Sequence, residues 1–76
     1  MEIKEKIKEV IAGVLKVRAE EIKDDAKLYE GIGVDSTEMV EVVISLEKAF
    51  NTKFSPKEIT KFSTLSEIEK AIQSRL

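Results

Sequence analysis

The stretch that decides the fold is GVDSTEMVEVVISLEKAF, residues 33–50. Its apolar residues recur at three- and four-residue spacing, which is the stripe of an amphipathic helix. The members of this stripe are Met39, Val42, Val43, Leu46 and Phe50. Val40, Ile44 and Ala49 flank the stripe, so the helix is unusually apolar, and Asn51 is a suitable residue to end it.

Three predicted helix starts share one pattern, an N-cap residue followed three positions later by glutamate. The pairs are Asp35–Glu38, Ser55–Glu58 and Thr64–Glu67. If Ser36 were the cap of its helix, the residue three positions on would be Met39, whose side chain cannot accept the backbone N–H of the cap residue. With Asp35 as the cap, Ser36 becomes the first helical residue. Its hydroxyl is then available at the helix N-terminus, where unpaired N–H groups and the helix dipole favour a bound phosphate.

Upstream of this helix, the sequence predicts another helix and a long loop. Apolar residues at helical spacing from Ile3 to Leu15 indicate an amphipathic helix of about four turns. Gly13 inside it costs roughly 1 kcal/mol relative to alanine, which suggests a close approach to another helix. Residues 17–34 lack periodicity, and their spaced apolar residues indicate an ordered loop.

Downstream, a short helix is expected from about Pro56 to Lys61, with proline at the first helical position. A last helix is expected from Leu65 to about Ser74. The predicted fold class is therefore all-α. The architecture is a small four-helix bundle of three longer helices and one short one, with a long loop between the first and second, and residues 1–76 form a single domain.

Composition limits what this chain can do. It has no cysteine and no histidine, so disulfides and cysteine-based zinc sites are excluded. No apolar run is long enough for a signal peptide or membrane insertion, so the expected location is cytoplasmic. Residues 20–47 have a net charge of −7 and the remainder +5, within an overall −2. This balance argues against nucleic acid as a partner and suggests an acidic face for basic partners.

The residues themselves leave Ser36 with few chemical roles. A nucleophilic serine needs an adjacent base, usually histidine, and the chain has none, so we expect no catalytic residue. The adjacent Asp24 and Asp25 lack calcium-loop spacing and are expected to be solvated, so no metal site is predicted. A serine without any role also fits these observations.

The quoted stretch resembles the Asp-Ser-centred second helix of acyl carrier proteins. The Asp-Ser pair, Val40–Glu41, and Leu46 through Phe50 stand in register with that family. The segment AEEIKDDAKLYEGIGVDS is similar to the family's long first loop, and residues 56–72 are similar to its last two helices. The resemblance covers nearly the whole chain.

This resemblance implies a carrier rather than an enzyme. In the family, a phosphopantetheinyl transferase moves 4′-phosphopantetheine from coenzyme A to the serine hydroxyl, and the thiol of the arm holds an acyl group as a thioester. By position, Ser36 would be the attachment site. The implied function is delivery of acyl intermediates to enzymes of fatty-acid, polyketide or related biosynthesis. The alternatives are an aminoacyl or D-alanyl carrier and a helical interaction module that carries nothing.

The resemblance also implies a partner surface on the same helix. Its expected partners are the transferase and acyl-transferring or acyl-modifying enzymes with basic docking patches, visited by a monomeric carrier. The expected contact residues are Asp35, Thr37, Glu38, Val40, Glu41, Ile44 and Glu47. Exposed ion pairs contribute only about 0.2–1 kcal/mol each, so such a surface would mainly steer brief encounters.

Some residues depart from the family's pattern. Thr37 stands where a leucine usually follows the serine, and Gly31 replaces a common acidic residue. Lysines also reduce the acidity of the second half of the chain, at Lys48, Lys53, Lys57 and Lys61. These differences suggest a specialised stand-alone carrier that serves one pathway.

Overall fold

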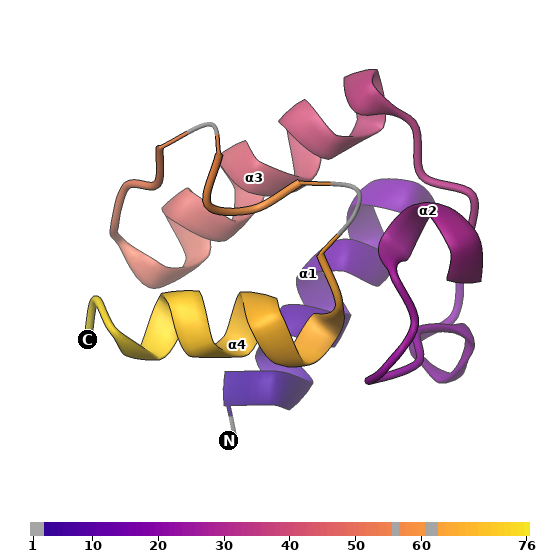
Figure 1. Cartoon of the computed structure of the whole chain (residues 1–76), viewed down its shortest axis with the longest axis horizontal. Helices are drawn as coiled ribbons and strands as arrows, with labels where there is room; N and C mark the ends of the chain where they lie inside the picture. The colour runs from indigo at the N-terminus through magenta and orange to yellow at the C-terminus, as the bar shows by residue number, and fades with distance from the viewer. Residues whose placement is uncertain (1–2, 56, 61–62) are drawn as a thin grey trace.

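The computed structural model describes residues 3–55, 57–60 and 63–76. Within these ranges, five helical elements follow one another: α1 (Ile3–Leu15), the 3₁₀ turn η1 (Ala19–Glu21), α2 (Leu28–Gly31), α3 (Ser36–Phe50) and α4 (Leu65–Gln73). α1 packs against both α3 and α4. In Figure 1, α3 lies above α4, α1 passes behind them, and the connection between α3 and α4 crosses the front.

The core is built from one apolar face of each long helix together with single residues from the connections. Its buried members are Ile7, Ile11, Ile22, Leu28, Val34, Met39, Val42, Leu46, Ile59, Leu65, Ile68 and Ile72. No polar or charged side chain is buried among the described residues. The all-α class and the small helical bundle predicted from periodicity are therefore confirmed. No helix in the described ranges is long and apolar enough to cross a membrane.

Helix α3 begins and ends where the sequence predicts. The Glu38 N–H donates to Asp35 Oδ1 at 2.8 Å, and the Asp35 N–H donates to Glu38 Oε1 at 3.2 Å. This reciprocal capping box makes Asp35 the N-cap and Ser36 the first helical residue. At the other end, Asn51 adopts a left-handed conformation with φ 53°, and the Thr52 N–H returns to the Glu47 carbonyl at 3.0 Å.

Helix α4 uses the same capping pattern. The Thr64 hydroxyl accepts the Glu67 N–H at 3.2 Å, and Glu67 Oε1 accepts the Thr64 N–H at 2.8 Å. Three residues of α4 are fully buried against the core: Leu65, Ile68 and Ile72. The cap fixes where the helix starts, and burial of this stripe holds it against α1.

The first connection is ordered and anchored by apolar residues, as predicted, but it contains helical turns that the sequence did not predict. It contains η1 and the single turn α2, and its anchors Ile22 and Leu28 are buried. The Leu28 N–H donates to the Ser63 carbonyl at 3.1 Å, and the Ser66 N–H donates to the Asp24 carbonyl at 3.3 Å. The connection is thus tied to the start of α4. These hydrogen bonds position the segment that leads into Ser36.

The prediction of a short helix from Pro56 to Lys61 is wrong for the part that the structure describes. Pro56, Lys61 and Phe62 lie outside the described residues. Residues 57–60 form a turn rather than a helix, with Ile59 directed into the core. Among the described residues, the short α-helix is α2 instead.

The suggestion that Gly13 marks a close helix approach is also wrong. A Cβ atom added at this exposed position would meet nothing within 4 Å. Gly13 therefore adds flexibility to α1 without making room for a neighbour.

Candidate functional site

Ser36 lies exposed at the first position of α3. The capping of this helix is done by Asp35, so the Ser36 hydroxyl takes no part in it. No residue in the described ranges hydrogen-bonds this hydroxyl. The side chain is therefore accessible and uncommitted, as a site of covalent attachment requires.

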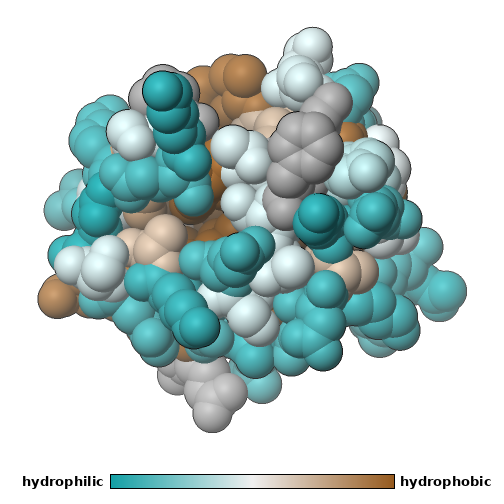
Figure 2. All heavy atoms as spheres, in the orientation of Figure 1, coloured by the Kyte–Doolittle hydropathy of each residue, from teal (hydrophilic) through white to brown (hydrophobic). Residues whose placement is uncertain are grey.

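The other predicted contact residues divide by location along α3. Thr37, Val40, Glu41 and Ile44 share the exposed side of the helix with Ser36, since their spacing is one, four, five and eight residues. Val40 is 58% exposed and Ile44 45%, which is high for aliphatic side chains. Figure 2 shows hydrophobic residues gathered along the upper edge of the viewed face, over α3.

Asp35 and Glu38 contribute to this region in a different way. Each of their carboxylates accepts one backbone N–H in the capping box. They add negative charge beside Ser36, but their side chains are held by the helix start. Their first role is therefore structural, and a partner would meet them as fixed charges.

Glu47 is set apart from the exposed residues by a backbone contact. It is half-buried, and its Oε2 accepts the Phe54 N–H at 2.9 Å. This bond fastens the chain that leaves α3 back onto the helix. No local pattern predicts this bond, because the two residues are seven positions apart and lie on either side of the helix end.

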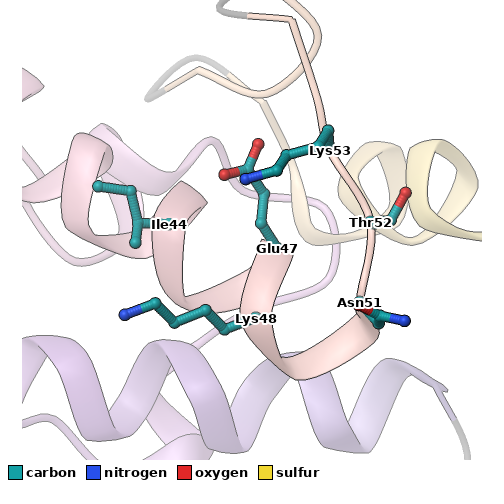
Figure 3. Close-up of a pocket in the computed structure, with 6 residues that line it drawn as sticks. All are labelled: Ile44, Glu47, Lys48, Asn51, Thr52 and Lys53. Carbon is teal, nitrogen blue, oxygen red and sulfur yellow. The ribbon is translucent and has the colours of Figure 1, made fainter.

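A hollow of about 280 Å³ lies at the C-terminal end of α3 (Figure 3). Its lining residues are Ile44, Glu47, Lys48, Asn51, Thr52 and Lys53. Within the described chain, neither Lys48 nor Lys53 forms an ion pair within 4.0 Å. In the sequence alone, both lysines stand out only as departures from the pattern of the family that the chain resembles.

The shifted ionisable groups lie away from Ser36. A hydrogen bond from Lys4, supported by Lys8, holds the pKa of Asp24 below its ordinary value. The backbone N–H of Ser55 lowers the pKa of Glu58, with help from Arg75. Over the described residues, no group of three acidic side chains could hold a metal ion. These interactions join parts of the fold and offer no base for Ser36.

Comparison with known proteins supplies the family. Residues 5–72 match the family described as "Phosphopantetheine attachment site". The chain is also 36% identical over 74 residues to the "Acyl carrier protein" of Wolinella succinogenes, a match covering 97% of each chain. The chain belongs to the acyl carrier protein family. Its members carry a covalently attached 4′-phosphopantetheine and do not catalyse reactions themselves.

The residues present fit that group. The exposed hydroxyl at the start of a fifteen-residue helix offers an attachment point next to unpaired backbone N–H groups. The chain contains no thiol of its own, so the arm supplies the one that bears the acyl group. Acyl carrier proteins interact with phosphopantetheinyl transferases and acyl-handling enzymes. Membership of this family favours a carrier over the alternative of a helical module that carries nothing.

Proposed function

We propose that Ser36 is the residue to which 4′-phosphopantetheine is attached. The observation that supports this best is an elimination among the serines. The other described serines are half-buried or use their hydroxyl groups in hydrogen bonds: Ser45, Ser55, Ser63, Ser66 and Ser74. Ser36 combines exposure with a hydroxyl that is unbonded within the described chain.

The start of α3 also suits the charge that attachment introduces. The Asp35 side chain accepts the N–H of Glu38, and the Asp35 carbonyl accepts the N–H of Met39. The N–H groups of Ser36 and Thr37 have no acceptor in the described ranges. Together with the helix dipole, they favour a phosphodiester at this end, although the neighbouring acids oppose it.

The attachment step balances without any further reactant. A bond forms between Ser36 Oγ and the β-phosphorus of coenzyme A, and the bond from that phosphorus to the bridging oxygen of the diphosphate breaks. Adenosine 3′,5′-bisphosphate leaves, and the hydroxyl proton passes to a base on the transferase. Because this chain has no histidine, we expect the base to come from the partner.

Intact mass spectrometry tests this assignment. The chain is incubated with coenzyme A, Mg²⁺ and a broad-specificity phosphopantetheinyl transferase, beside Ser36→Ala and the matched control Ser55→Ala. We expect one phosphopantetheinyl unit on the wild type and on Ser55→Ala, and none on Ser36→Ala. Loading of Ser36→Ala would refute the assignment.

The more specific role that we propose is a monomeric, cytoplasmic, stand-alone carrier, with residues 1–76 acting as one domain. It would deliver acyl thioesters within fatty-acid, polyketide or related biosynthesis. Thr37 and the lysines near the end of α3 support a specialised member, because they alter the exposed side of this helix. The exposed Val40 and Ile44, together with Glu41, would receive partners with basic docking patches.

A further inference from the structure

The hollow at the end of α3 differs in charge from the region around Ser36. Near Ser36 the helix start carries three acids within seven residues: Asp35, Glu38 and Glu41. At the hollow, Lys48 and Lys53 bring two positive charges against the single carboxylate of Glu47. Beyond the backbone N–H groups at the helix start, these acids repel an anion. At the last turn the two lysines attract one, against the negative end of the helix dipole.

Glu47 only partly cancels the lysines. Its Oε2 is committed to the Phe54 N–H at 2.9 Å. In Figure 3 the side chains of Glu47 and Lys53 point toward one another, but they form no ion pair within 4.0 Å. Arg75 adds a further cation close by, since its Nε donates to the Lys53 carbonyl at 2.9 Å, although its guanidinium is paired with Glu58. The hollow thus keeps a net positive charge.

One face of α3 connects this hollow with Ser36. Positions 36, 40, 44, 47 and 51 recur at three- and four-residue spacing and so lie along the same side of the helix. Between the two ends stand the exposed aliphatic side chains of Val40 and Ile44. Ile44 also lines the hollow, so an apolar path leads from the serine to the lysines.

The distances match the length of a phosphopantetheine arm. A helical rise of about 1.5 Å per residue places Ile44 about 12 Å and Lys48 about 18 Å along the axis from Ser36. The arm has roughly fourteen bonds from the serine oxygen to its sulfur. Since three backbone bonds span roughly 3.3–3.6 Å, an extended arm reaches about 16 Å. A short acyl group on its thiol would extend to the lysines.

We propose that the hollow binds the terminal carboxylate of an acyl group carried on the Ser36 arm. When the cargo is the monothioester of a dicarboxylic acid, Lys48 and Lys53 would hold its free carboxylate, with the carbon chain against Ile44. This inference rests on the proposed attachment at Ser36. Two exposed ion pairs of ordinary strength would raise the ratio of docked to undocked acyl group by about two- to thirtyfold.

Nuclear magnetic resonance on the loaded protein tests the proposal. ¹⁵N-labelled chain is loaded from malonyl-coenzyme A or from acetoacetyl-coenzyme A, and loading is verified by intact mass. The two acyl groups have nearly the same shape, but only malonyl ends in a carboxylate. We expect malonyl, and not acetoacetyl, to move the amide signals of Asn51, Thr52 and Lys53. High salt, about 1 M, should reverse this effect.

Two matched variants separate a specific site from general charge. Lys48→Gln/Lys53→Gln should abolish the malonyl-dependent shifts, because it removes both cations of the hollow. Lys23→Gln/Lys70→Gln should retain these shifts. It is the matched control, since it also removes two exposed lysine charges but leaves the hollow intact. Equal shifts from both acyl groups, or no shift from malonyl, would overturn the inference and leave these lysines to an acidic partner. A wild type that accepts no arm would overturn the proposed function and this inference with it.

Discussion

The two connections between the long helices are held by different contacts: the first is tied to the start of α4, and the second pairs with Arg75. Residues 17–34 were expected to be an ordered loop but contain η1 and α2, and residues 57–60 were expected to be helical but form a turn. The first connection gains its helical turn from distant contacts, because Leu28 is buried and its N–H bonds to Ser63. Local capping residues thus neither guarantee a short helix nor are required for one.

The second connection shows why the capping pattern at Ser55 fails to produce a helix. Glu58 Oε1 accepts the Ser55 N–H at 3.3 Å, as a capping box requires, but the other oxygen of Glu58 pairs with Arg75. A helix of only six residues also gains too few hydrogen bonds to offset its nucleation. At Asp35 and Thr64, long apolar stripes follow the cap and are buried.

The largest effects should come from the buried anchor of each connection. We expect Leu28→Ala and Ile59→Ala each to lower the free energy of unfolding by about 2–5 kcal/mol, because each leaves a cavity in the core. The exposed controls Glu30→Ala and Lys57→Ala should change it by less than about 0.5 kcal/mol. Urea denaturation measures all four. A Leu28→Ala cost no larger than its control's would mean that the first connection is not docked.

Replacement of Gly33 and of Gly13 by alanine should change the stability of the fold in opposite directions. Gly33, at the end of the first connection, has φ 70°, so alanine there should destabilise the fold by about 1–2 kcal/mol. Gly13 lies in α1 with open space around it, so alanine there should stabilise the fold by about 0.5–1 kcal/mol. Thermal unfolding of the two variants would reveal the opposite signs, and equal signs would contradict the backbone argument.

Removal of the helix N-cap side chains should have the next largest effect on stability. Asp35→Ala and Thr64→Ala each remove a side-chain acceptor from a helix start and should cost about 1 kcal/mol. Ser55→Ala should cost less than about 0.5 kcal/mol, because it caps no helix in the described chain, and exposed Ser36→Ala should be equally mild. Chemical denaturation of the four variants makes the comparison. A Ser36→Ala cost above that of Asp35→Ala would show that the cap is wrongly assigned.

The smallest effect should be a dependence on pH in the first connection. Asp24 Oδ2 lies 3.1 Å from Lys4 Nζ, and Oδ1 lies 3.3 Å from Lys8 Nζ. These contacts lower the pKa of Asp24, so the stability that it contributes is present above its ordinary pKa of about 4 and lost as pH falls through the folded-state value. Asp25 and Glu69 also face Lys4, whose pKa is raised.

We therefore expect Asp24→Asn to be less stable than the wild type at neutral pH and to approach it in acid. The free energy of unfolding of both proteins, followed from about pH 7 to pH 3 in low salt, gives the comparison. A difference that stays constant over this range would mean that the charge of Asp24 does not stabilise the fold.

The helix starts and the candidate attachment residue follow from local sequence. Hydrogen bonds between residues three positions apart define the caps at Asp35 and Thr64, and the apolar period defines the buried faces of α1, α3 and α4. The same local pattern put Ser36 at the first helical position with a hydroxyl left out of the cap. These features were predictable because their partners lie within one or two helical turns.

Other features were decided only by tertiary structure. The Leu28 N–H donates to the Ser63 carbonyl thirty-five positions later in the chain, and Glu58 forms an ion pair with Arg75. The Glu47 carboxylate accepts the Phe54 N–H beyond the end of α3. The hollow beside Lys48 and Lys53 exists because that last contact folds the chain back against α3. No local pattern encodes such contacts, since each forms only when distant segments pack on a common core.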